Sequence, residues 1–86
     1  MPTLHDYQIQ GDLAKAIAFY EKALKLDEQL GRKEGMANQY GNLGNVYKTQ
    51  GDLANAKNYY LMSIELFKYL GSPNEKKAQA LLDALQ

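Results

Sequence analysis

Three asparagines are the side chains whose type and spacing are most suggestive of chemistry. Asn38, Asn42 and Asn45 are separated by four and three residues, so a helix would bring them to one face. Asparagine is about 0.5 kcal/mol less favourable than alanine inside a helix, so three on one face need an explanation. A carboxamide both donates and accepts hydrogen bonds, and a row of them can pair with a peptide backbone of any sequence. The alternative explanation is a solvent-facing row that serves solubility.

Catalytic or metal chemistry finds little support in the sequence. His5 is the single histidine and the chain has no cysteine, which argues against a metal cluster, a disulfide and a dyad of two histidines. Ser63 corresponds to Ala23 in the internal repeat described below, which favours a small packed residue over a nucleophile. The glycines of the segment 41–45 lack the Lys-Ser/Thr pair of a phosphate-binding loop. We therefore expect no enzyme, no bound metal and no cofactor.

Charge and hydropathy argue against two further classes of partner. Ten basic and ten acidic residues balance within 86 residues, so no charge excess points to nucleic acid or to a membrane surface. No apolar run approaches the roughly 20 residues that cross a bilayer. The first residues lack the charged and then apolar pattern of a signal peptide. We expect one small soluble domain with a cytoplasmic location.

The chain contains an internal repeat with an offset of 40 residues. The matched positions are Tyr7 with Tyr47, Gln10–Ala14 with Gln50–Ala54, Ala16 with Ala56, Tyr20 with Tyr60, Leu26 with Leu66, and Leu30-Gly31 with Leu70-Gly71. Turn and core positions agree together, which an unrelated helical bundle with two similar turns would match only by chance. A period in the range of about 20–50 residues is typical of stacked supersecondary units.

Glycines and capping residues predict five helices. The expected ranges are 3–10, 13–30, 33–49, 53–70 and 73–85. Gly51 can adopt the left-handed backbone that ends a helix, and Asp52 can cap the helix that follows. Gly31 and Gly71 are suited to the same role as Gly51. The segment Ser72–Glu75 supplies a capping serine, a proline for the first turn and a glutamate that completes a capping box.

The two central helices carry a recognisable spacing of packing residues. These residues are Tyr40-x2-Leu43-Gly44-x2-Tyr47 and then Ala56-x3-Tyr60. The spacing resembles the tetratricopeptide repeat, although that family often has Trp at the first position and Pro where this chain has Lys68. The 40-residue period is similar to the longer variants of kinesin light chains and spindle-orientation adaptors. The resemblance implies an all-α fold of antiparallel helix-turn-helix repeats, stacked as a short right-handed superhelix.

The resemblance also implies a domain organisation and a function. A single domain at 1–86 would comprise a shortened repeat at 1–30, a complete repeat at 31–70 and a capping helix at 71–86. In this family the first helices of the repeats line a concave groove that holds an extended peptide or a partner helix. Residues between the packing positions would face this groove. The implied peptide-binding residues are Asn38, Asn42, Asn45, Lys48, Thr49 and His5, with Lys76, Gln79 and Asp83 on the last helix.

Self-association is the alternative function. Four polar residues of the first repeat are apolar in the second: Glu21 becomes Leu61, Lys22 becomes Met62, Asp27 becomes Phe67 and Gln29 becomes Tyr69. A helix that is apolar nearly all round needs cover on more than one side. This pattern predicts a homodimer through residues 61, 62, 67 and 69, with exchange of helices about Gly31 or Gly71 as one way to form it.

Overall fold

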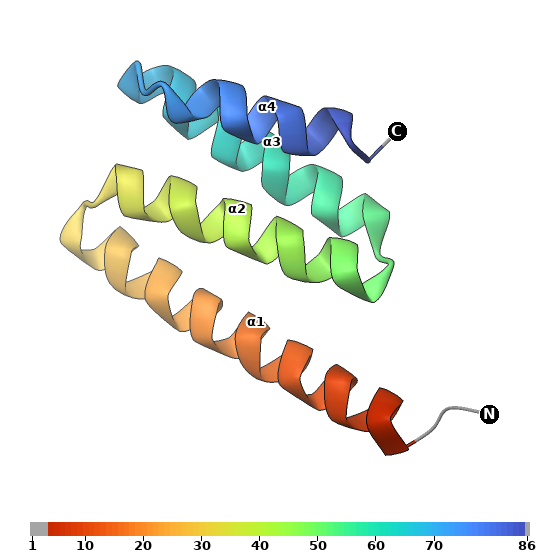
Figure 1. Ribbon diagram of the computed structural model, residues 1–86. Coiled ribbons are helices and arrows are strands. Elements are labelled where there is room, and N and C mark those ends of the chain that lie inside the picture. The colour runs from red at the N-terminus through yellow and green to blue at the C-terminus, as the bar shows by residue number, and fades with distance from the viewer. Residues whose placement is uncertain (1–3, 86) are drawn as a thin grey trace.

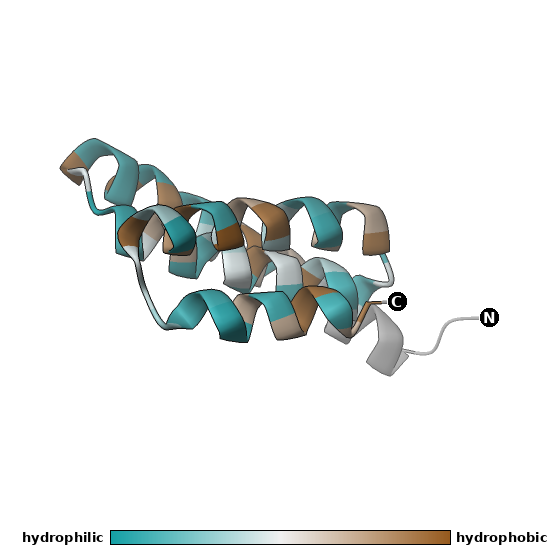
Figure 2. Cartoon of the chain, turned by 90° about the horizontal axis from the view of Figure 1, so that it is seen from above, coloured by the Kyte–Doolittle hydropathy of each residue, from teal (hydrophilic) through white to brown (hydrophobic). Residues whose placement is uncertain are grey.

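The computed structural model describes residues 4–85 of the chain, with side chains described for residues 10–85. This part of the chain has no strand and forms four helices: α1 (Leu4–Leu30), α2 (Lys33–Gln50), α3 (Leu53–Leu70) and α4 (Asn74–Asp83). Each helix returns antiparallel to the one before it, and α4 packs on α3 (Figure 1). Hydrophilic and hydrophobic residues alternate along the helices (Figure 2). The predicted all-α fold is confirmed.

Three glycines end α1, α2 and α3 in the same way. Gly31, Gly51 and Gly71 have φ angles of 69°, 84° and 65°, a left-handed conformation that glycine adopts without steric penalty. At each turn the amide after the glycine donates to the carbonyl five residues back, at 2.9 Å: Arg32 to Asp27, Asp52 to Tyr47, and Ser72 to Phe67. This pattern is the Schellman arrangement, and it confirms the three predicted helix ends.

Side chains cap the starts of α3 and α4. Asp52 Oδ1 accepts a hydrogen bond of 3.1 Å from the backbone amide three residues ahead, as predicted. Ser72 Oγ accepts a hydrogen bond of 3.1 Å from the amide of Asn74. The predicted capping box is wrong, because the Ser72 amide that Glu75 would bind already donates to the carbonyl of Phe67. The serine therefore caps the helix without help from the glutamate.

The predicted helix break at residues 10–12 is also wrong. α1 continues through this segment, and Gly11 does not adopt a positive φ. The predicted helix 3–10 would span little more than two turns, so it could bury little surface by folding back on its neighbour. Continuing one helix adds a backbone hydrogen bond per residue, whereas a separate short helix needs costly nucleation. The first two predicted helices are therefore one.

The core lies where α3 packs against both α2 and α4. Tyr60 of α3 is fully buried, and a Cβ on Gly44 of α2 would come within 2.6 Å of two carbons of its ring. Glycine is therefore required for this close approach. Phe67 of α3 packs with Ala37 of α2 and with Ala78 of α4, and Leu82 of α4 packs in the cluster of Tyr60. These contacts hold α2 and α4 on the same side of α3.

Candidate functional site

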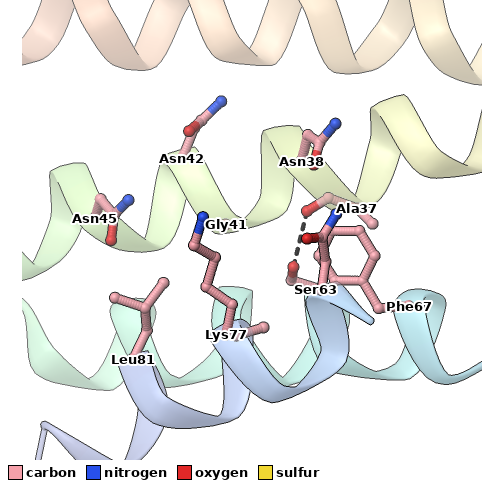
Figure 3. A pocket seen from close by; sticks show the side chains of 11 residues that line it. Ala37, Asn38, Gly41, Asn42, Asn45, Ser63, Phe67, Lys77 and Leu81 are labelled. Carbon is pink, nitrogen blue, oxygen red and sulfur yellow. Dashed lines mark hydrogen bonds between the residues drawn. The ribbon is translucent and has the colours of Figure 1, made fainter. Parts of the chain in front are cut away.

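A groove lies between α2 and α4, and α3 forms its floor (Figure 3). Its volume is about 430 Å³, within the range of about 300–1,000 Å³ that is typical of ligand sites. The polar residues along its sides are Asn38, Asn42 and Asn45 from α2 and Asn74 and Lys77 from α4. Carboxamides therefore dominate the polar chemistry of this groove, and Lys77 adds a positive charge.

The three asparagines predicted from their spacing all line the groove. Asn45 is held in place because the hydroxyl of Tyr60 donates to its Oδ1 at 2.5 Å, which leaves the amide NH2 group to donate. Asn42 Nδ2 lies 3.3 Å from Oε1 of Gln39, which leaves the oxygen of Asn42 to accept. The row of carboxamides thus offers both donors and acceptors.

Ser63 and Phe67 of α3 form part of the floor. The Ser63 side chain is 1% exposed, and its Oγ donates to the carbonyl of Ala37 at 2.8 Å (Figure 3). This bond ties α3 to α2 and occupies the hydroxyl proton. Ser63 is therefore a packed residue, as the sequence indicated, and not an exposed nucleophile.

Sequence reasoning missed Lys77. Lys76, Gln79 and Asp83 were expected in the groove because an offset of 38 residues relates the last helix to residues 33–50. None of the three lines it. On the exposed side of α4, Gln79 Nε2 instead donates to Asp83 Oδ1 at 3.0 Å. Lys77 precedes Leu81 by four residues, so both lie on the side of α4 that faces α2 (Figure 3). That spacing is the signal that would have found Lys77.

Lys48 and Thr49 are not brought to the groove by the structure. Lys48 and Thr49 are exposed near the C-terminal end of α2 and do not line it. The Thr49 hydroxyl donates to the carbonyl of Asn45 at 3.0 Å, within its own helix. The side chain of His5 lies outside the described residues. The groove therefore contains the three predicted asparagines but not Lys48 or Thr49, and peptide binding by any of these residues stays a prediction.

The residues predicted for self-association divide into two groups. Phe67 is 5% exposed and is covered by α4, so its side chain does not reach the surface. Leu61, Met62 and Tyr69 are exposed. The Nζ atom of Lys33 lies over the Tyr69 ring, 4.4 Å from its centroid. Any contact between copies on this side of α3 can involve only the second group.

Tyrosines of α2 and α3 also pack against one another. The rings of Tyr47 and Tyr59 stack at 5.4 Å with 5° between their planes, and Tyr40 lies 6.2 Å from Tyr59. Burial is the main cause that raises the pKa of Tyr59 above its ordinary value of 10.0, and the nearby Tyr47 is the next largest cause. Burial likewise raises the pKa of Tyr60. The phenols of Tyr59 and Tyr60 therefore stay neutral at physiological pH and serve packing.

Antiparallel helix pairs that stack along one direction define the class of helical-repeat proteins. Residues 5–69 match a family described as tetratricopeptide repeat. The match covers most of the chain, which therefore belongs to the tetratricopeptide repeat family. Repeats of this family typically form non-catalytic scaffolds, so the general class of function is that of a protein-interaction module. No curated protein and no solved structure gave a match.

Residues 4–85 contain no membrane-spanning helix, and the side chains of residues 10–85 contain no metal-binding group. Within residues 4–85 no helix combines the length and the apolar character needed to cross a bilayer. Among the side chains described for residues 10–85, no group of three His, Asp or Glu is placed to hold a metal ion.

Proposed function

We propose that this chain binds an extended peptide segment or a partner helix of another protein in the groove between α2 and α4, without catalysing a reaction. The observation that carries the proposal is that three asparagines from α2 and Lys77 from α4 line one groove. The resemblance of the chain to peptide-binding repeats supports the same function.

The groove chemistry suits a peptide backbone. The Asn45 NH2 group can donate to a carbonyl of the bound segment, and the Asn42 oxygen can accept from an amide. Lys77 can donate to a carbonyl or a carboxylate at the opposite side. Because the described groove is short, it can contact only a few residues of a ligand, and the expected dissociation constant is about 10 micromolar or weaker.

Selection of displayed peptides tests this function. A library of random 12-residue peptides is selected against the chain, and the best peptide is titrated into the protein and its variants. Asn42→Ala and Lys77→Ala should each weaken binding about three- to tenfold, since each removes a hydrogen bond to the ligand. Asn58→Ala is the matched control, because Asn58 is an exposed asparagine on α3 outside the groove. Equal affinity for all four proteins would reject this site.

Self-association through α3 is the second candidate function. The exposed side chains of Leu61, Met62 and Tyr69 support it, since burial of a large apolar side chain contributes roughly 1.5–3 kcal/mol before association costs. Sedimentation equilibrium at about 100 micromolar should then give a dimer mass, and Met62→Glu should return the monomer. A monomer mass for the unmodified chain at this concentration would end this candidate.

A further inference from the structure

α1 carries an exposed apolar stripe away from the peptide groove. Phe19, Leu26 and Leu30 are 67%, 53% and 55% exposed, and their spacing of seven and four residues places them on one side of the helix. Beside them lies an open hollow of about 600 Å³, lined only by residues of α1, with Phe19, Ala23 and Leu26 as its apolar part. A stripe of this kind is a candidate contact surface.

The internal repeat shows what covers the equivalent stripe on α3. The 40-residue offset relates Phe19, Ala23 and Leu26 to Tyr59, Ser63 and Leu66. α2 covers the α3 positions: its tyrosines pack on the ring of Tyr59, and its Ala37 carbonyl accepts from Ser63 Oγ. The open face of α1 therefore corresponds to the surface on α3 where α2 is seated.

Charge distinguishes the two equivalent surfaces. The hollow bordered by α2 and α3 contains Lys33 from α2 and Met62 and Glu65 from α3. On α1 the positions of Met62 and Glu65 are taken by Lys22 and Lys25, which line the open hollow. The open face of α1 is thus basic at positions where the border of the α2–α3 contact on α3 is apolar and acidic.

The positions of the other charged residues of α1 keep this edge basic. Lys15 is exposed and precedes Lys22 by seven residues, so it extends the basic edge along the helix. The acidic Glu21 and Glu28 lie on the side towards α2 and α3, where they contribute to raising the pKa values of Tyr59 and Tyr40. They are therefore directed away from the open hollow.

We propose that this face of α1 binds an acidic amphipathic helix of a partner protein, laid antiparallel to α1 as α2 lies on α3. The partner helix needs an apolar or aromatic side chain against Phe19, and acidic side chains against Lys22 and Lys25. Two copies of α1 are the poorer match, because antiparallel pairing about a two-fold axis would bring the same basic edges together. The surface is separate from the groove between α2 and α4, so it adds a second contact.

A stapled peptide serves as the probe. Residues 33–50 of the chain are synthesised as a helix, with a hydrocarbon staple joining positions 38 and 42, which lie on the groove side of α2 and not on the side that packs on Tyr59. One peptide keeps Lys33 and a second carries Lys33→Glu. Lys33 of α2 lines the α2–α3 hollow together with Glu65 of α3, and the 40-residue offset relates Glu65 to Lys25 of α1. When the peptide lies on α1 as α2 lies on α3, its residue 33 should therefore lie near Lys25.

Titration of both peptides into the 15N-labelled chain gives the readout. The Lys33→Glu peptide should bind about two- to fivefold more tightly than the Lys33 peptide, and Lys25→Glu in the protein should reverse this preference. Amide shifts should change around Phe19, Ala23 and Leu26 and not around Asn42. Phe19→Glu should weaken binding about tenfold, while Leu53→Glu, at a position 50% exposed on α3, should leave it unchanged.

Three outcomes would overturn the proposal. The first is no shift at α1 with about 1 millimolar of either peptide. The second is the same peptide preference in the Lys25→Glu protein. The third is a dimer of the chain that Phe19→Glu disperses, which would make a second copy the occupant. None of these outcomes bears on the peptide groove, whose test uses Asn42 and Lys77.

Discussion

Replacing Gly44 by alanine tests the packing on which the fold and the groove depend. The new Cβ would lie 2.6 Å from two carbons of the Tyr60 ring. That ring is fully buried and its hydroxyl is bonded to Asn45, so it cannot turn aside. Overpacking of this kind costs up to about 3 kcal/mol, and alanine returns about 1 kcal/mol in helix propensity. Gly44→Ala should therefore lower the free energy of unfolding by about 2 kcal/mol.

Gly41→Ala is the matched control on the same helix. Its Cβ would lie 3.5 Å from Ser63 Oγ, an ordinary contact, so the gain in helix propensity of about 1 kcal/mol should remain. For a domain of this size the midpoint of thermal unfolding should fall by about 8–16 °C for Gly44→Ala and rise by about 4–8 °C for Gly41→Ala. Circular dichroism at 222 nm measures both. A Gly44→Ala protein as stable as the unmodified chain would refute the reasoning.

Substitutions at three other positions give separate tests by urea and thermal unfolding. Gly11→Ala should stabilise the protein by about 0.5–1 kcal/mol, because Gly11 lies inside α1 and an added methyl group would meet nothing within 4 Å; a loss of stability would point to a turn there. Asp52→Ala should cost about 1 kcal/mol through loss of the α3 cap, and Asp52→Asn should restore most of it. Burial raises the pKa of Tyr60 in the folded state, so its contribution to stability is complete below pH 10.0 and is lost as the pH rises above that value. Tyr60→Phe should flatten this alkaline loss, and an unchanged pH profile would contradict the assignment.

The pentapeptide Gln-Gly-Asp-Leu-Ala shows how far sequence alone could predict this fold. It occurs at 10–14 and at 50–54, and the pattern predicted a turn at both places. The second copy forms the turn, with Gly51 in the left-handed conformation, while the first copy lies inside α1. Local sequence permits a turn at both sites, and packing selects it only where a long helix can return. The turns at 31, 51 and 71 were therefore predictable, whereas continuity through Gly11 was not.

The candidate site shows the same division between spacing and packing. The positions of Asn38, Asn42 and Asn45 follow from the helical period alone, and the structure places all three in one groove. Whether Lys77 faces the groove depends on how α4 is rotated about its axis. Burial of Ala78 against α3 sets this rotation. A repeat offset transfers position along the chain but not this rotation, so it selected the neighbouring Lys76.

Phe67 shows why an apolar substitution between repeats is weak evidence for a second copy. The first repeat has Asp27 at this position, and Asp27 packs where a Cβ on Gly35 would come within 2.6 Å of its carboxylate. Phe67 instead meets Ala78 of α4, so a neighbouring helix of the same chain explains its apolar character. The same comparison leaves Met62 and Tyr69 on the surface, with no helix of the described residues covering them. Evidence for self-association must therefore come from these two exposed positions and their neighbour Leu61, and the open face of α1 must be tested separately.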